Sequence, residues 1–215
     1  LMQLIKGWRE NGYAIDLYTS AEGNGFLSKI EDINYRFFSY KWNQNKIVRL
    51  INLCLSQLEL FLKIFFNSKK GDLIYVNTVL PFGAAIAGKL KRIRVIYHIH
   101  ETSVKPEILK WFLSKVVYWC ADDIIFVSNY LASTQHLKGK KIHILHNAIE
   151  NSFKTTADTN KTLKNEVNHI LMISSLKEYK GVFEFVKIAR NIPECEFTMV
   201  LNASKPEIHE FFKDT

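Results

Sequence analysis

Short apolar runs rich in β-branched and aromatic residues recur along the chain, and helical patterns separate them. Most of these runs are continuously apolar, which is typical of strands buried on both faces of a parallel sheet. The predicted strands of the first part of the chain lie within residues 13–20, 34–40, 72–77, 94–100, 122–128 and 141–147. The predicted helices cover 1–10, 46–67, 82–91, 107–119 and 129–137. This alternation predicts a doubly wound, Rossmann-like α/β domain.

Residues 46–66 form the one long apolar stretch, and its length alone would suffice to cross a membrane. Polar residues interrupt it too often for a membrane span: Arg49, Asn52, Gln57, Glu59 and Lys63. Apolar positions at helical spacing form one stripe: Ile47, Leu50, Ile51, Cys54, Leu55, Leu58, Leu62 and Phe65. We therefore expect a soluble amphipathic helix that packs this stripe on the sheet.

Residues 150–168 are polar, rich in Thr, Asn and Lys, and only weakly periodic, as is typical of a linker. Strand patterns resume at 169–174 and 196–203, with a helical pattern at 181–191 between them. A further helix begins near Lys205. The strand–helix order therefore starts again after the linker, which indicates the beginning of a second Rossmann-like domain.

We expect an N-terminal Rossmann-like domain in residues 1–149, a linker in 150–168 and part of a second domain in 169–215. The first part begins on a helix, whereas doubly wound domains ordinarily begin on a strand. Two strands with their helices are also too few to complete the second domain. These patterns predict a chain shortened at both ends relative to a complete two-domain protein.

The net charge of +8 favours an anionic partner, although charge of this size also serves solubility. Basic clusters at 88–94 and 137–143 each precede a predicted strand, so we interpret them as solvated turns at the edge opposite the candidate site. Peripheral contact with anionic lipid headgroups is the alternative. Aromatic residues do not interleave with these charges as they would on a nucleic-acid surface, so no nucleic-acid partner is expected.

The three cysteines, Cys54, Cys120 and Cys195, are far apart and suit neither a disulfide framework nor a zinc site. Each lies in an apolar stretch, where cysteine usually behaves as a small buried hydrophobe. The start of the sequence lacks the apolar region and cleavage site of a secretory signal. These features predict a cytoplasmic protein, with a peripheral position at the inner face of the membrane as the variant of that prediction.

In open α/β sheets, ligands bind outside the carboxyl ends of the strands. Polar residues gather at these predicted ends: Asn77, His98, His100, Glu101, Ser128, Asn129, His146, Asn147, Ser174 and Ser175. A single Ser or Asn there is more often a turn or capping residue, but their coincidence predicts one crevice. The pair His98 and His100 lacks obvious further metal ligands, so no metal is expected. His100, nearer the strand end, is the stronger candidate to bind a substrate hydroxyl or phosphate.

Lys180 and Gly181 open the predicted helix 181–191 after the strand that ends at Ser174. Unpaired N–H groups and the positive end of the dipole favour an anion at a helix N-terminus. Lys180 would add a charge, and Gly181 would let the backbone approach the anion closely. The spacing is not that of a Walker A loop, and a solvated lysine beside a glycine remains the plain alternative.

The segment WCADDIIFVSNYL, followed closely by KIHILHNAIE, resembles a recurrent signature of retaining glycosyltransferases with the GT-B fold, in family four. DLIYVNTVLPFGAAIAGKLKRIRVIYHIHET resembles the N-terminal domain of that family, and ILMISSLKEYKGVFEFVKIA is similar to the opening of its nucleotide-binding domain. The resemblance covers nearly the whole chain. It implies that residues 1–149 hold the acceptor and that 169–215 belong to the nucleotide-sugar-binding domain.

The resemblance also implies an activity: a hexosyltransferase-type enzyme that moves a sugar from a nucleotide diphosphate sugar to an acceptor hydroxyl with retention. His100 matches the family histidine near the reacting sugar and is the catalytic candidate. Lys180 matches the phosphate-binding lysine, with Gly181 and Ser175 beside it. The predicted interdomain cleft is lined by Asn77, Glu101, Ser128, Asn129 and Asn147. No metal or cofactor is implied, and the partners would be the nucleotide-sugar donor and a glycan or lipid-linked acceptor, in cell-surface polysaccharide synthesis.

The sequence departs from the family pattern in the second domain. Ser174 and Ser175 stand where the family usually has glycine and arginine, and Asn202-Ala203-Ser204 replaces a glycine-rich turn. The family's acidic donor motif would lie beyond residue 215, so we expect this chain alone to be a poor catalyst. The alternative is a degenerate homologue that serves as a binding or assembly protein. Another doubly wound nucleotide-binding enzyme is a third reading, against which the lack of G-x-G-x-x-G counts.

Overall fold

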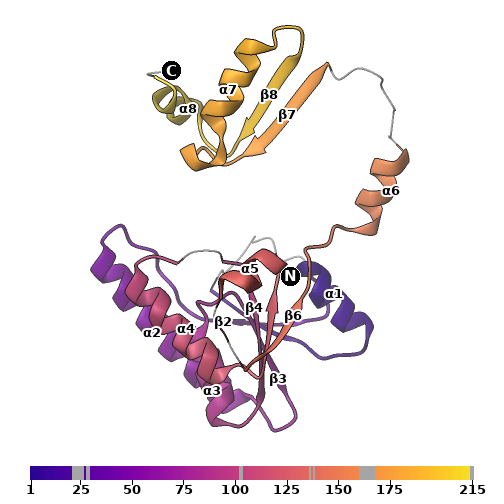
Figure 1. Ribbon diagram of the computed structural model, residues 1–215. Coiled ribbons are helices and arrows are strands. Elements are labelled where there is room, and N and C mark those ends of the chain that lie inside the picture. The colour runs from indigo at the N-terminus through magenta and orange to yellow at the C-terminus, as the bar shows by residue number, and fades with distance from the viewer. Residues whose placement is uncertain are drawn as a thin grey trace. The chain divides into compact units, whose positions relative to one another are not determined.

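The computed structural model describes residues 1–20, 27, 30–101, 104–135, 137, 139–159 and 168–213 (Figure 1). Strands in these residues pair in parallel, in three separate sheets. The chain divides into two compact units, Leu1–Phe153 and Lys154–Thr215. The predicted strands and helices all occur, with ends that differ by a few residues, so the α/β class is confirmed.

The main sheet of the first unit has the strand order β3-β4-β5-β6, and its strands are β3 (Leu73–Asn77), β4 (Arg94–Ile99), β5 (Asp123–Phe126) and β6 (Lys141–Ile144). The crossover helices are α3 (Phe82–Leu90), α4 (Glu107–Cys120) and α5 (Asn129–Thr134). Tyr97, Ile124 and Phe126 are fully buried in this sheet. Since all four strands are parallel, their carboxyl ends meet at one edge, as the sequence predicts.

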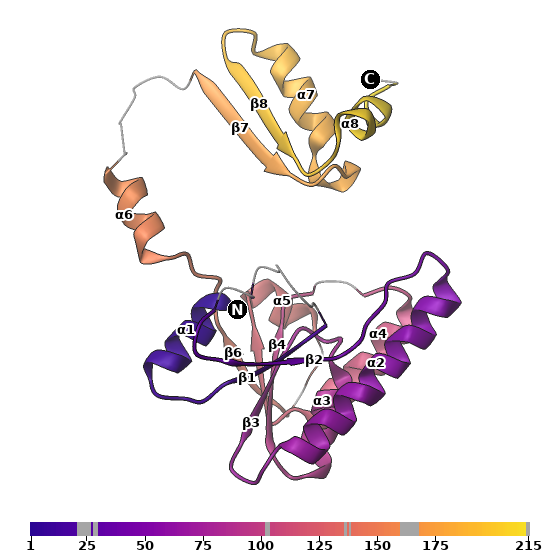
Figure 2. The same ribbon diagram turned by 180° about the vertical axis from the view of Figure 1, so that it is seen from behind.

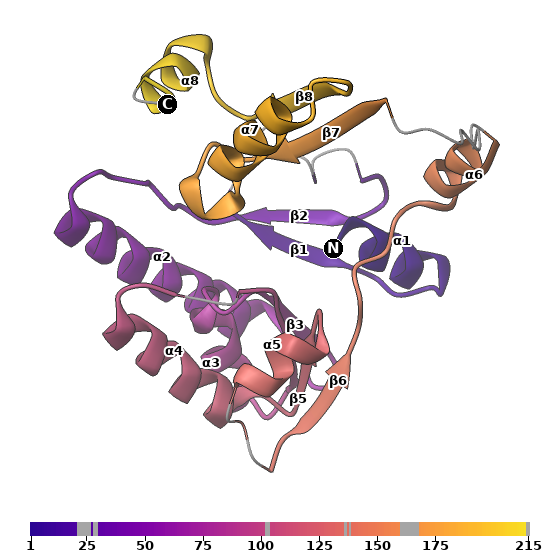
Figure 3. The same cartoon turned by 45° about the horizontal axis from the view of Figure 1, so that its top comes forward.

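A second, smaller sheet of the first unit pairs β1 (Asp16–Thr19) with β2 (Asn34–Phe37), and the two strands run side by side in Figure 3. The helix α1 (Met2–Glu10) precedes them. Its Trp8 ring meets the Tyr75 ring of β3 edge-on, with centroids 4.7 Å apart, and its Ile5 is buried. These contacts attach the first helix of the chain to the main sheet.

The helices α2 (Lys46–Asn67), α3 and α4 cover the same side of the main sheet (Figures 1 and 2). The helix α2 packs closely on α3, and its Leu60 and Ile64 belong to the same buried core as residues of β3. At the contact of the two helices, the amide N–H of Gly83 donates to Oε1 of Gln57 at 3.0 Å. A Cβ on Gly83 would lie 2.1 Å from the Gln57 carbonyl oxygen, so glycine is what permits this approach.

The predicted buried side of α2 is wrong, although the predicted bounds of the helix are right. Its buried residues are Ser56, Gln57, Leu60 and Ile64. The predicted stripe is largely exposed: Ile47, Leu50, Ile51, Cys54, Leu55, Leu58 and Leu62. Because α2 is apolar around most of its circumference, periodicity alone could not tell which side the small residues of α3 would accept. Within the described residues, no helix combines the length and the apolar character that crossing a bilayer requires.

The cysteines divide between core and surface. Cys120 is fully buried at the end of α4, as expected for a small hydrophobe, and Cys195 is half-buried. Cys54 is exposed on α2, which corrects the expectation that it lies in the core. The physical reason is the packing of α2, whose opposite side meets α3.

The second unit contains β7 (His169–Ser174) paired in parallel with β8 (Glu196–Leu201), together with a 3₁₀ turn η1 (Glu178–Lys180) and the helices α7 (Val182–Asn191) and α8 (Lys205–Phe211). Val182 is buried, and the Phe183 and Phe211 rings stack at 5.0 Å. The helix α6 (Asn151–Thr159) occupies the first half of the segment predicted as a linker, and none of its residues is buried. The rest of that segment, residues 160–167, lies outside the described residues.

Candidate functional site

Two of the predicted site residues meet at the carboxyl edge of the main sheet. Asn77 ends β3, and His100 follows the end of β4. The Nε2 of His100 lies 3.0 Å from Oδ1 of Asn77. With the amide oxygen facing the ring, Nε2 donates this hydrogen bond and Nδ1 keeps its lone pair. The Asn77 side chain thus orients the His100 ring at the place where a ligand of an open α/β sheet would bind.

His98 supports this ring from within the core. It is only 3% exposed, its Nδ1 lies 2.7 Å from the Tyr75 hydroxyl, and its ring centroid is 4.1 Å from that of His100. Burial, and then the neighbouring His100, lower the pKa of His98 to about 4. Burial also lowers the pKa of His100. Both rings are therefore neutral at pH 7, and Nε2 of His98 has no hydrogen-bond partner among the described residues.

Glu101 bends back toward the same edge. Its Oε2 accepts a hydrogen bond from the backbone N–H of His100 at 3.3 Å. Alternation along an ideal strand would point Glu101 away from the histidines. Because β4 ends at Ile99, that alternation no longer applies to Glu101. Its side chain also lines a cavity of about 30 Å³ beside α4, which is room for one water molecule.

The residues after β5 and β6 have more ordinary surroundings. The Ser128 hydroxyl accepts from the Leu131 N–H at 3.1 Å, so it caps α5. Asn129 is the first residue of α5 and is exposed, as is Asn147 beyond β6. The structure therefore places these three residues after the carboxyl ends of the strands but gives Ser128 a structural task of its own.

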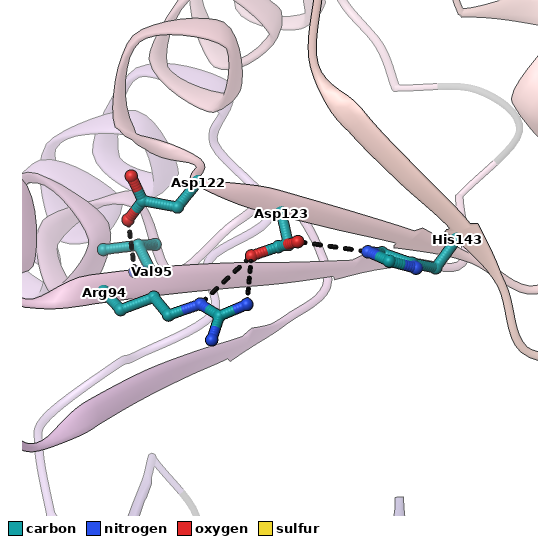
Figure 4. A network of polar contacts seen from close by, with 5 residues as sticks. All are labelled: Arg94, Val95, Asp122, Asp123 and His143. Carbon is teal, nitrogen blue, oxygen red and sulfur yellow. Dashed lines mark hydrogen bonds and ion pairs between the residues drawn. The ribbon is translucent and has the colours of Figure 1, made fainter.

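Asp122 and Asp123, which belong to the sequence signature, lie at the opposite edge of the sheet (Figure 4). The Asp123 carboxylate accepts from Arg94 at 2.7 and 3.1 Å and from Nε2 of His143 at 3.1 Å. The Asp122 carboxylate accepts from the Val95 N–H at 2.8 Å. The hydrogen bond from Arg94, and then that from His143, lowers the pKa of Asp123. This network connects β4, β5 and β6 at their amino ends, far along the strands from His100.

In the second unit, Lys180 ends the turn η1 and Gly181 caps α7. Gly181 has φ +79°, in the left-handed region that favours glycine, while a Cβ there would meet only Glu184 at 3.8 Å. Backbone conformation thus already requires this glycine, whether or not a ligand approaches. Ser175 is half-buried after β7, and its carbonyl accepts from the Lys177 N–H at 2.8 Å.

A second lysine joins Lys180, and the sequence reasoning missed it. The Nζ atoms of Lys177 and Lys180 lie 5.9 and 5.2 Å from the centroid of the Tyr179 ring. Both lysines are exposed just before α7. Their three-residue spacing was the available signal. The N-terminus of α7 therefore carries two cations in addition to the positive end of its dipole.

The described residues contain no group of three or more His, Cys, Asp or Glu that could hold a metal ion. Two lysines of the basic clusters noted in the sequence have hydrogen-bond partners within the fold. Lys91 donates to the carbonyls of Phe65 and Ser68, and Lys140 donates to that of Ala121. These lysines stabilise turns, in agreement with their interpretation as turn residues but with internal partners instead of solvent.

Comparison with known proteins adds a family and a fold. The family model described as Glycosyltransferase Family 4 matches residues 1–153, which is the whole first unit. The apo structure of OtsA is similar with a TM-score of 0.67 and 13% identity, over 98% of this chain and 64% of that one. A trehalose-6-phosphate synthase studied for enzymatic glycosyltransfer with retention has a TM-score of 0.62 and 14% identity, over 97% of this chain and 62% of that one.

The α,α-trehalose-phosphate synthase (UDP-forming) from Burkholderia vietnamiensis is also similar, with a TM-score of 0.54 and 11% identity, over 80% of this chain and 48% of that one. At such low identities the likeness supports the fold, and it confirms the predicted GT-B-like architecture. The chain spans less than two thirds of the length of each of these proteins. A comparison with curated protein sequences gave no match.

Proposed function

The chain belongs to glycosyltransferase family 4, and we propose from this premise that it transfers a hexose from a nucleotide diphosphate sugar to an acceptor hydroxyl with retention. The match of the family model to the whole first unit is the observation that carries this proposal. A glycan or lipid-linked compound of the cell surface is the proposed acceptor class. The GT-B neighbour studied for glycosyltransfer with retention supports the stereochemical part.

The donor diphosphate is proposed to bind at the N-terminus of α7. Gly181 turns the backbone there, and unpaired N–H groups of the first helical turn would face the phosphates. Lys177 and Lys180 supply the positive charge that stabilises a leaving diphosphate. No metal is required for this role, because helix dipole and lysines act on the same charge. Ser175 would contribute at most a hydroxyl where the family pattern has an arginine.

His100 is the proposed catalytic residue of the first unit. It is neutral, because burial lowers its pKa, and its Nε2 is committed to Asn77. The remaining Nδ1 can accept a hydrogen bond from a sugar hydroxyl. A fixed, neutral ring at the edge of the sheet would position the reacting sugar and favour the transition state over the ground state through orientation. Asn77 acts as the positioning residue.

The first experiment is thermal unfolding of the chain with UDP, GDP and ADP and their sugar conjugates. UDP and UDP-sugars come first, because the Burkholderia relative is named as UDP-forming. A nucleotide at 100 times its dissociation constant should stabilise the fold by about 2.7 kcal/mol. The Lys180→Ala variant should lose most of this gain. The Lys187→Ala variant, which removes an exposed lysine farther along α7, should keep it. Absence of any shift with every nucleotide would contradict the donor site.

Turnover is tested separately from binding. The purified chain is incubated with the stabilising nucleotide sugar and sugar acceptors, and release of the nucleotide is followed together with the anomeric configuration of the product. Slow turnover with retention of configuration is expected, and loss of that turnover in His100→Ala. The alternative, a degenerate homologue that binds without catalysis, is favoured by Ser174 and Ser175 in place of the family's glycine and arginine. Nucleotide binding without turnover would support that alternative.

A further inference from the structure

The helix α2 has one surface that nothing in the described residues covers. One side of α2 packs on α3, and a second, polar side forms hydrogen bonds with the segment that precedes the helix. There, Oε2 of Glu59 accepts from the Ser39 N–H at 2.9 Å, and the Asn52 amide donates to the Lys41 carbonyl at 2.8 Å. The third side is apolar, and its side chains are between 43% and 76% exposed: Ile47, Leu50, Ile51, Leu55, Leu58, Leu62 and Phe66.

The helix α4 of the same layer exposes large aromatic and aliphatic side chains as well: Ile108, Trp111, Phe112, Tyr118 and Trp119. Trp42, just before α2, is exposed, and Arg49 lies over its ring at 5.8 Å. The Lys115 ammonium lies 5.9 Å from the Trp111 ring. Tryptophan and tyrosine beside basic residues are the combination that favours a membrane–water interface, since their rings have an apolar body and a polar group.

The charge around this surface distinguishes between two partners that could bind it, a second copy of the chain and a lipid bilayer. Residues 41–70 hold six basic side chains and one acidic one, and residues 105–119 hold three basic and one acidic, in a chain of net charge +8. Most of the excess positive charge therefore lies in and beside α2 and α4. Two copies that met through this surface would oppose like charges, which disfavours association. An anionic lipid bilayer offers the complementary charge and an apolar layer below it.

We propose that the uncovered apolar side of α2, together with the exposed aromatics of α4, binds the surface of an anionic lipid bilayer. The helix lies in the plane of the interface, with its apolar side chains inserted and the flanking Lys46 and Lys110 at the headgroups. This inference is independent of the proposed glycosyl transfer and moves the membrane contact away from the basic clusters first suspected.

The test is flotation of the purified chain with vesicles of phosphatidylcholine alone and with vesicles that also contain phosphatidylglycerol. Binding is expected with the anionic vesicles and should weaken as salt screens the charges. Leu55→Glu should lower the partition coefficient about tenfold or more, because it removes one inserted side chain. Leu73→Glu on β3 is the matched control, since Leu73 is 51% exposed and Leu55 is 59% exposed. Lys46→Gln should lower binding about fivefold.

Circular dichroism of each variant shows whether the fold is kept, and quenching of tryptophan by brominated lipid reports insertion in the unmodified chain even if a variant fails to fold. Equal binding to neutral and anionic vesicles, or none to either, would overturn the proposal. So would equal losses in Leu55→Glu and Leu73→Glu. A dimer in light scattering that Leu55→Glu dissociates would assign the surface to a second copy of the chain instead.

Discussion

The Nε2 atom of His100 lies 3.0 Å from Oδ1 of Asn77, so a side-chain hydrogen bond joins the end of β3 to the residue that follows β4. This contact gives His100 a defined orientation before any substrate binds. Pre-orientation of that kind matters because a reacting group is useful only near its productive geometry. In this contact, His100 is the residue that would touch substrate, and Asn77 is the residue that holds His100 in place.

Replacing Asn77 by alanine should therefore lower the transfer rate without weakening nucleotide binding. Loss of one orienting hydrogen bond corresponds to a decrease in kcat of about tenfold. His100→Ala should lower kcat further, by about 10²-fold, because it removes the imidazole ring itself. Steady-state kinetics would show the decrease in kcat with an unchanged KM for the donor. Asn67→Ala at the end of α2 is the control, and a similar loss there would indicate a general effect on the fold.

Burial of His98 makes stability depend on pH. Its pKa is about 4 in the folded chain, against 6.5 for an unperturbed histidine, so the unfolded state binds the proton first as pH falls. The free energy of unfolding should be fully present above pH 6.5 and should decrease by about 3 kcal/mol down to pH 4. Denaturant titrations at a series of pH values measure this. In His98→Asn the slope over that range should flatten, and an unchanged slope would assign the effect elsewhere.

Two glycine substitutions should have opposite effects on stability, because only one of the two glycines lies in the close contact of α2 with α3. Gly83→Ala would place a Cβ 2.1 Å from the Gln57 carbonyl oxygen, and forcing the helices apart should cost about 3 kcal/mol. Gly7→Ala, in α1, meets no atom within 4 Å and should stabilise the fold by about 1 kcal/mol through helix propensity. Thermal and chemical unfolding compare the two. Equal stabilities would mean that α2 does not approach α3 this closely.

The strands and helices could be predicted from the sequence because each carries its own periodicity, and the carboxyl-edge location of Asn77 and His100 followed from parallel pairing. The packing side of α2 could not, since its apolar residues nearly encircle the helix and the choice depends on Gly83 in another helix. The bend of Glu101 toward His100 depends on where β4 ends, which periodicity sets only within a few residues. Because these features depend on residues far apart in the sequence, the local sequence pattern of each element carries little information about them.

The network around Asp123 also had only a partial signal in sequence. Its position before a strand places it at the amino edge, but Arg94 and His143 come from two other strands, 29 and 20 residues away. Register brings them together, because Asp123 pairs with Ile96 on one side and Lys141 on the other. A pair of aspartates that reads as part of a family signature thus stabilises the sheet, at the edge opposite the candidate site.

Asp123→Asn tests that structural role. The carboxylate is 4% exposed and its pKa is lowered first by Arg94 and then by His143, so its contribution to stability is present above the ordinary value of 3.8 and is lost as pH falls through the folded value. At pH 7 the free energy of unfolding of the variant should be lower by about 1.5–3 kcal/mol, which is what hydrogen bonds to a charged group contribute. The difference from the unmodified chain should shrink in acid, as the pH falls below 3.8 toward the lowered pKa of Asp123 in the folded chain. Chemical unfolding at pH 7 and pH 3 measures it, with Asp158→Asn on the exposed helix α6 as control. A difference that persists unchanged in acid would show that the asparagine disturbs packing and that charge is not what Asp123 contributes.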